Sequence, residues 1–285
     1  MSRARELFRE VIARPHCTLA ANIFDPLSAR IAHMLGYEIC VLSGSVGKVA
    51  NLGVPDIVLS NMSDVVDHCR RITRIADVSL MVDAEDGFGN AVNVVRTVRE
   101  MEAAGVAAIE IEDNFVPRRF NVAAPGLVST EEQVGKLEAA VAARTDPTTV
   151  IVARSAALGL CPLDEALERI RAYSRTGAEA LMLTGASSRE QIEAVRGVTS
   201  LPLCVLNPPA DARNDQAFLD ANMHILMLGN PTYAVAVRAI HDSLKHLQDG
   251  GALEALAERQ APPELLRQVN RTDEFVELQE RYLRD

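Results

Sequence analysis

The sequence contains no run of apolar residues long enough to cross a membrane, and its N-terminal segment lacks the apolar core of a secretory signal. It also lacks a stripe of lysine and arginine, and its formal net charge is −10. Nucleic acids and anionic membranes are bound by clustered basic residues, so we expect neither as a partner. Five cysteines are scattered without CxxC spacing. Separated thiols in odd number favour a reducing compartment, and we predict a cytoplasmic protein.

What the sequence does contain is a regular alternation of short apolar segments and amphipathic segments. Alternation of strands and helices predicts a parallel sheet, and eight such units in this length predict an α/β fold, a closed (β/α)8 barrel of the TIM type. A doubly wound open sheet is the alternative. The eight expected strands lie at 18–24, 39–42, 80–83, 108–111, 150–153, 180–183, 203–206 and 224–228.

No linker rich in glycine and serine divides the chain, so we predict a single barrel domain over residues 1–285. The residues that follow Pro262-Pro263 exceed what eight units need. We therefore expect residues 262–285 to form a helical extension, with a helix at about 264–280, that could be exchanged between subunits.

The clearest local signal lies in residues 80–90, where an apolar strand ends in the carboxylates Asp83, Glu85 and Asp86. Alternation along an extended chain would put Asp83 and Glu85 on one face. Adjacent hard oxygen ligands suit Mg²⁺, Mn²⁺ or Ca²⁺ better than Zn²⁺. A solvated acidic turn is the other interpretation of this short run.

Polar residues follow every predicted strand, and in a barrel all strand ends meet at one mouth. Glu112 would stand beside Asp83 and Glu85, so that the three carboxylates can converge on one hard cation. The strand-end residues are Asp25, Ser43 with Ser45, Asp83 with Glu85 and Asp86, Glu112 with Asp113, Arg154, Thr184, Asn207 and Asn230.

Two further features at this mouth suit an anionic substrate. Gly44, between Ser43 and Ser45, leaves backbone N–H groups open to an anion or a developing oxyanion. Arg154 offers a planar fork to a carboxylate, although a structural salt bridge to Glu112 or Asp83 is the alternative. Together with a metal, these groups predict a site for a small, doubly anionic oxo acid.

Several stretches carry a family resemblance, namely FDPLSARIA (24–32), LSGSVG (42–47), DAEDGFGNAVNVVRTV (83–98), GVAAIEIED (105–113) and VIVARSAA (150–157). They resemble the isocitrate lyase/phosphoenolpyruvate mutase superfamily over most of the chain, to about residue 245. The resemblance implies a Mg²⁺ ion at the barrel mouth, bound directly by Asp83, with Glu85 and Glu112 in a supporting shell. Asp56 matches the loop position of another supporting carboxylate, and Glu85 replaces the more usual Asp. The resemblance also implies a homotetramer, built as a dimer of dimers.

Residues 114–129, after the fourth strand, distinguish the branches of this superfamily. Isocitrate and methylisocitrate lyases carry a KKCGH-type loop with a catalytic Cys, which is absent from Pro117-Arg118-Arg119-Phe120-Asn121. Mutases and phosphonopyruvate hydrolases carry Lys and Asn on a gating loop, which the Arg118-Arg119 pair matches weakly. The chain most resembles the bacterial oxaloacetate decarboxylases. In that branch Ser45 and Arg154 match substrate positions, and a third position falls at Asn230, where the branch has His.

The function implied by the resemblance is decarboxylation of oxaloacetate to pyruvate and CO₂ with Mg²⁺, or with Mn²⁺ in its place. Asp83, Ser45 and Arg154 would be catalytic, and Ser43, Gly44, Ser45, Arg154 and Asn230 would bind a 2-oxo dicarboxylic acid. One alternative keeps the metal site and changes the reaction, to P–C chemistry on phosphonopyruvate or C–C cleavage of a substituted malate. A second alternative is a non-catalytic protein that binds oxo acids.

Overall fold

The computed structural model describes residues 2–117, 120–121 and 126–283. The chain forms two compact units, Met1–Asn230 and Pro231–Asp285. The expectation of one domain over 1–285, with an extension from 262, stays a prediction.

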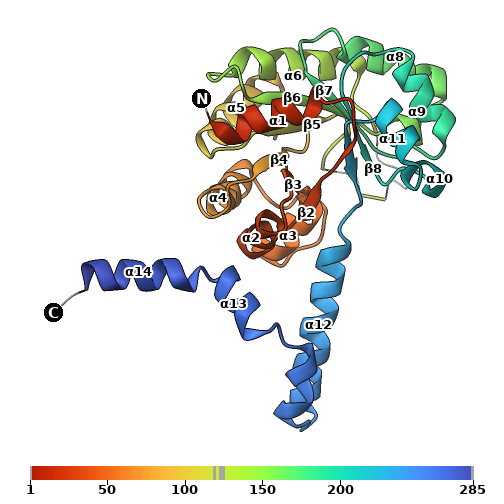
Figure 1. The fold of residues 1–285 in the computed structure, drawn as a ribbon. Coiled ribbons are helices and arrows are strands. Elements are labelled where there is room, and N and C mark those ends of the chain that lie inside the picture. The colour runs from red at the N-terminus through yellow and green to blue at the C-terminus, as the bar shows by residue number, and fades with distance from the viewer. Residues whose placement is uncertain (1, 118–119, 122–125, 284–285) are drawn as a thin grey trace. The chain divides into compact units, whose positions relative to one another are not determined.

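The first unit is built around a parallel sheet whose two edges nearly meet (Figure 1). The edge strands β1 and β2 are separated by Ala20 alone, and they pair with β9 and β3 respectively. The first predicted strand is therefore split across the seam of a nearly closed TIM-type barrel, which confirms the barrel over the open sheet. The strands are β1 (Thr18–Leu19), β2 (Ala21–Ile23), β3 (Ile39–Leu42), β4 (Ser79–Asp83), β5 (Ala108–Glu112), β6 (Val150–Ser155), β7 (Ala180–Leu183), β8 (Leu203–Leu206) and β9 (Ile225–Met227).

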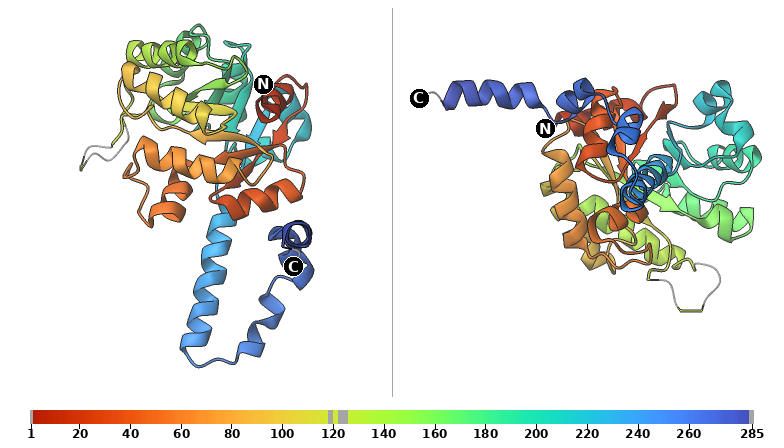
Figure 2. Two further views of the ribbon diagram at one scale, coloured as in Figure 1. Left: turned by 90° about the vertical axis from the view of Figure 1, so that its left-hand side faces the viewer. Right: turned by 90° about the horizontal axis from the view of Figure 1, so that it is seen from below.

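Helices lie on the outside of these strands (Figure 2), and several begin at side chains that cap their first turn. Asp25 and Asn61 each accept a hydrogen bond from the backbone N–H three residues on, and Ser129 caps α6 in the same way. The helices of this unit are α1 (Arg3–Ile12), α2 (Pro26–Met34), α3 (Gly44–Leu52), α4 (Met62–Thr73), α5 (Ala91–Ala103), α6 (Thr130–Ala143), α7 (Ala157–Leu160), α8 (Leu163–Tyr173), α9 (Arg189–Arg196), α10 (Ala210–Arg213) and α11 (Gln216–Asn222).

The helix α3 was not expected from the sequence, which suggested only a loop between the second strand and Asp56. Its sequence, GSVGKVANL, holds two glycines, and its N-cap residue Ser43 makes no side-chain cap bond. Local helix signals are therefore weak. The helix forms because Val46 and Gly47 are buried against the barrel. As a result, Ser43, Gly44 and Ser45 occupy a helix N-terminus rather than a free loop.

The inner core of the barrel is closed by α1 at the end where the strands begin. Phe8 and Val11 are fully buried in one apolar cluster with inward-facing strand residues such as Val41, Met81 and Val152. Arg5 fixes α1 by donating to the backbone oxygens of Val106 at 3.0 Å and Glu102 at 2.6 Å. Because this end is filled by side chains, the open mouth with its polar groups lies at the other end.

The second unit consists of helices, which are α12 (Pro231–Gln248), the 3₁₀ helix η1 (Leu253–Arg259), α13 (Pro263–Val269) and α14 (Thr272–Tyr282). The helix predicted at about 264–280 is divided in two, because Arg271 takes a left-handed conformation with φ of 54°. Among the residues that the structure describes, no helix has both the length and the apolar character needed to cross a bilayer.

We predict that Phe8→Ala destabilises the barrel by about 3–5 kcal/mol, because it removes a fully buried aromatic ring from the closed end. Urea unfolding followed by circular dichroism would measure the change. Val92→Ala, at a side chain that is 79% exposed, is the control and should shift stability by less than about 0.5 kcal/mol. Equal effects of the two substitutions would contradict the role given to α1.

Candidate functional site

The sheet register brings the acidic and basic strand ends together at the mouth. Asp83, the last residue of β4, is aligned with Glu110 on β5, and Glu112 on β5 is aligned with Arg154 on β6. The Arg154 guanidinium lies 2.5 Å from Asp83 Oδ2 and 3.1 Å from Glu112 Oε2. The alternative interpretation of Arg154, a salt bridge to these two carboxylates, is thus what the structure contains.

Glu110 also belongs to this cluster. It was not predicted as a site residue, because it lies inside a strand that is otherwise apolar. It lies two residues before Glu112 on the same inward face, is 1% exposed, and has Oε2 3.4 Å from Arg154 Nη1. Its Oε1 is buried without a hydrogen-bond partner among the described residues. The sequence Glu110-Ile111-Glu112 indicates this position, because every second residue of a barrel strand points inward and Glu110 therefore lies on the same face as Glu112.

Asp83 and Glu85 converge, but for a different reason from the one expected. Alternation along an extended strand does not apply, because the chain turns at Glu85, where φ is 53°. The Glu85 N–H donates to Asp83 Oδ1 at 2.9 Å. The turn folds the second carboxylate back toward the first.

Gly44, at the start of α3, fits directly against this carboxylate pair. Its N–H donates to Asp83 Oδ2 at 3.3 Å. A Cβ at this position would lie 2.7 Å from Glu85 Oε1 and 3.0 Å from Asp83 Oδ2, so a larger residue would push the Glu85 carboxylate away. Glycine thus allows the present close approach of the pair, and the positive end of the α3 dipole faces the two carboxylates.

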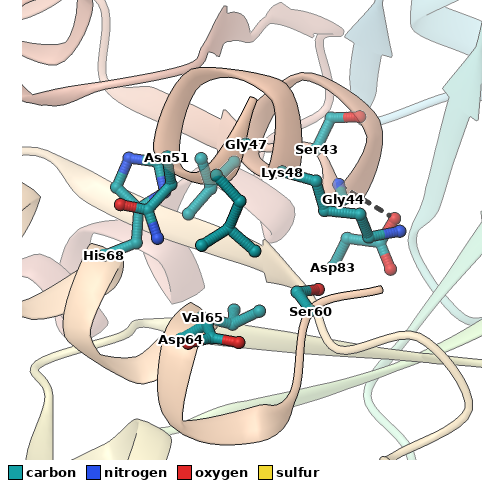
Figure 3. Close-up of a pocket in the computed structure, with 12 residues that line it drawn as sticks. Ser43, Gly44, Gly47, Lys48, Asn51, Ser60, Asp64, Val65, His68 and Asp83 are labelled. Carbon is teal, nitrogen blue, oxygen red and sulfur yellow. Dashed lines mark hydrogen bonds between the residues drawn. The ribbon is translucent and has the colours of Figure 1, made fainter. Parts of the chain in front are cut away.

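Lys48 is a second residue that the sequence analysis missed, because α3 itself was not predicted. Its Nζ lies 2.8 Å from Asp56 Oδ1 and forms an ion pair with Glu85. The lysine is 3% exposed. Figure 3 shows Lys48 on the same helix as Gly44, with its side chain directed toward the side of the pocket on which Asp83 lies. Asp56, predicted to support the metal, lies on the loop after α3 and reaches this cluster through Lys48.

The predicted substrate residues are joined by hydrogen bonds across the mouth. Ser43 Oγ and Ser45 Oγ lie 3.1 Å apart, and Asn230 Nδ2 donates to Ser45 Oγ at 3.3 Å. Asn22 Nδ2 in turn donates to Asn230 Oδ1 at 3.3 Å. A cavity of about 290 Å³, open to solvent, is lined by Asn22, Ser43, Asp83, Glu110, Arg154, Asn230 and four apolar side chains, those of Val41, Met182, Leu206 and Met227.

Other strand-end residues serve the fold. Asp25 caps α2, and Asp86 pairs with Lys136. Asp113 is buried and accepts hydrogen bonds from Ser155 and Tyr173. Of the loop 114–129, the pair Arg118-Arg119 lies outside the described residues, and the Asn114–Leu127 bridge joins its two ends.

Burial and neighbouring charge separate the pKa values of the clustered carboxylates. Burial opposes ionisation of Asp83, but the Arg154 guanidinium and the Glu85 N–H outweigh it and lower the pKa of Asp83. Burial, reinforced by the Asp83 charge, raises the pKa of Glu85 to about 8. The same two causes raise the pKa values of Glu110 and Glu112 to about 7, although Arg154 opposes them. The cluster thus holds more negative charge than its cations neutralise.

The donors available for a metal are carboxylate oxygens, which suit Mg²⁺ or Mn²⁺. As the side chains stand, no three donor residues in the described part of the chain are grouped to hold an ion. Asp83 and Glu112 are turned toward Arg154, and Glu85 toward Lys48. Binding of a cation would require these carboxylates to exchange their present partners.

Comparisons with known proteins agree with this geometry. The sequence profile of the phosphoenolpyruvate phosphomutase family matches residues 8–248. An oxaloacetate decarboxylase of Rhodopseudomonas palustris (strain BisA53) is 40% identical over 270 residues, which are 94% of this chain and 93% of that protein.

Two solved structures share the fold over nearly their whole length. The phosphoenolpyruvate phosphomutase of Streptomyces platensis subsp. rosaceus has a TM-score of 0.88 and 29% identity, covering 98% of this chain and 99% of its own. A phosphonopyruvate hydrolase in complex with oxalate and Mg²⁺ has a TM-score of 0.86 and 29% identity, covering 99% of both chains. The chain therefore belongs to the phosphoenolpyruvate mutase/isocitrate lyase superfamily, as its strand-end motifs predicted.

Proposed function

We propose that this chain is a Mg²⁺-dependent carbon–carbon lyase that decarboxylates oxaloacetate to pyruvate and CO₂. The observation that carries the proposal is the similarity to an oxaloacetate decarboxylase at 40% identity over 94% of the chain. The mouth of the barrel supports it, because Arg154 and the N-terminus of α3 suit the charges of a small dicarboxylic oxo acid. The five cysteines are free, which supports the cytoplasmic location that we infer.

The residues present fit a divalent cation. The four buried carboxylates of Asp83, Glu85, Glu110 and Glu112 outnumber the two cations that pair with them, the partly exposed Arg154 and the buried Lys48, and Glu110 keeps an unpartnered oxygen among the described residues. A divalent cation would balance this charge; Asp83 would bind it directly, and Glu85, Glu112 and Asp56 would support it. When bound, the cation supplies Lewis acidity toward the carboxylate and 2-oxo oxygens of the substrate.

The side chains of the mouth orient the substrate. Arg154 is fixed by carboxylates on β4 and β5, so its fork is preorganised to bind a substrate carboxylate. The Ser45 hydroxyl is hydrogen-bonded to Ser43 and Asn230, which line the same cavity as Arg154, and the first N–H of α3 contacts Asp83. They would stabilise negative charge on the 2-oxo oxygen as CO₂ leaves.

Asn230 would lie near the departing carboxylate. Its amide cannot gain or lose a proton near neutral pH, so it can orient the substrate carboxylate but cannot act as an acid or a base. Hydrogen bonds to Ser45 and from Asn22 fix the amide. The site thus favours loss of CO₂ through positioning and charge stabilisation, and the enolate that is left takes up a proton from water to give pyruvate.

Turnover of oxaloacetate by the purified protein tests the proposal. We expect pyruvate to form only with Mg²⁺ or Mn²⁺, and Asp83→Ala to abolish this metal-dependent reaction. Asp86→Asn is the matched control, because Asp86 follows the same strand but pairs with Lys136, and it should retain activity. Metal-dependent activity that survives in Asp83→Ala would contradict the assignment.

A panel of substrates separates the proposed reaction from its relatives. Oxaloacetate, phosphonopyruvate and methylisocitrate would be offered with Mg²⁺ under identical conditions. We expect the highest kcat/KM with oxaloacetate. A preference for phosphonopyruvate would replace decarboxylation by P–C chemistry, and oxalate binding without turnover of any substrate would indicate a binding protein.

The stability of the metal-free protein should depend on pH because of the buried glutamates. The pKa values of three buried glutamates, Glu85, Glu110 and Glu112, are raised in the folded protein. Their protonation therefore stabilises the fold fully below about pH 4.5, and this stabilisation is lost as the pH rises to about 8. The pKa of Asp83 is lowered, so its contribution to the free energy of unfolding changes only at lower pH. In EDTA, the free energy of unfolding in urea should fall by more than about 1 kcal/mol between pH 5 and 8. Glu110→Gln should reduce this fall, and a pH-independent stability would contradict the charge excess.

We also propose a homotetramer, a dimer of dimers, in which residues 262–285 are exchanged between subunits. The support is that α12 has no buried residues, while Val235, Ile240 and Leu244 are more than half exposed. Light scattering on the full chain should give a tetramer, and a chain ending at residue 261 should give a smaller assembly. A full-length monomer would contradict the proposal.

A further inference from the structure

Lys48 occupies an unusual position, since it is a buried lysine against the carboxylates proposed for a metal. Its side chain is 2% exposed, and both of its ion-pair partners, Glu85 and Asp56, belong to the proposed metal-supporting set. The two pairs differ in environment, because the Glu85 side chain is 7% exposed and that of Asp56 is 55% exposed. An exposed ion pair contributes little to folding stability, whereas a buried carboxylate without a counter-charge lowers that stability strongly. The contact with Glu85 is therefore the stronger one.

Gly44 and Lys48 lie one helical turn apart on α3 and face the same two carboxylates. The Gly44 N–H contacts Asp83, and the lysine contacts Glu85. The atoms nearest to a Cβ at Gly44 would be those of the two carboxylates, so the absence of a side chain there leaves room for the pair. The helix thus brings a fixed N–H and a single positive charge to the edge at which a divalent cation would bind.

We propose that Lys48 is a positioning residue that holds Glu85 when no divalent cation is bound, and that lysine and cation compete for this carboxylate. The inference rests on the proposed function, since it assumes the metal site at Asp83. A lysine ammonium carries one positive charge, so it balances one negative charge even where it contacts two carboxylates, whereas a divalent cation balances two. It would keep Asp83 and Glu85 together despite their repulsion, and it would weaken cation binding by occupying Glu85 and by repelling the incoming charge.

Direct binding of Mn²⁺, measured from the electron paramagnetic resonance signal of the free ion, tests this without any turnover. The full-length protein would be compared with Lys48→Met, which removes the charge and the donors, and with Lys48→Gln, which removes the charge and keeps N–H donors. The second variant also guards against a failure of the first to fold. We expect both to bind Mn²⁺ about tenfold more tightly than the unsubstituted protein, because a nearby positive charge is lost. Lys48→Arg keeps the charge and should bind like the unsubstituted protein.

Lys136→Met is the matched control. Lys136 is 1% exposed, and like Lys48 it pairs with a carboxylate after β4, here Asp86. It contacts neither Asp83 nor Glu85 in any ion pair of the described residues. Its loss changes the net charge equally, so affinity should stay near that of the unsubstituted protein.

The possible outcomes distinguish the role of Lys48 from the proposed metal-dependent function on which it rests. Unchanged or weaker Mn²⁺ binding in Lys48→Met and Lys48→Gln, with normal binding by the unsubstituted protein, would overturn the role of Lys48 alone. Equal tightening in Lys136→Met would also overturn it, because net charge would then explain the effect. Absence of Mn²⁺ binding in every variant and in the unsubstituted protein would overturn the metal-dependent function itself.

Discussion

The structure of the mouth depends on one electrostatic constraint, which is an excess of buried carboxylates over the cations that pair with them. Such a cluster is stable only if each negative charge finds a counter-charge or a proton. Arg154 serves the carboxylates of β4 and β5, and Lys48 serves Glu85. Burial, reinforced by the negative charge that these two cations leave unneutralised, raises the pKa values of Glu85, Glu110 and Glu112. The same excess that strains the metal-free protein is what makes the site suitable for a divalent cation.

The backbone around the cluster is shaped to tolerate this crowding. The turn at Glu85 returns its carboxylate to Asp83, and glycine at position 44 leaves the space that the pair occupies. The N-terminus of α3 then faces negative charge, which its dipole favours. The closed end of the barrel, packed around Phe8, carries the apolar core and leaves the other end free for polar groups. Stability and chemistry are thus assigned to opposite ends of the same strands.

Membership of the superfamily limits the reactions that this chain is expected to catalyse, and the contacts to the substrate depend on the residues at its own barrel mouth. The chain belongs to the superfamily, and its mouth brings Asp83, Glu112 and Arg154 together. Glu85, Lys48, Glu110 and Asn230 lie around these three residues. In the proposed function, an uncharged amide and a buried lysine at the mouth would adjust how substrate and cation bind.

The sequence by itself determined the barrel, because strand and helix signals alternate and each strand is short and apolar. It also determined which strand ends carry Asp83, Glu112 and Arg154, since these follow directly on apolar runs. It did not predict α3, whose local helix signals are weak, and so Lys48 went unnoticed. Only the tertiary structure decided how the charges pair, because the register aligns Glu112 with Arg154 and Asp83 with Glu110. Pairing across strands depends on contacts between residues far apart in the chain, and no local pattern encodes them.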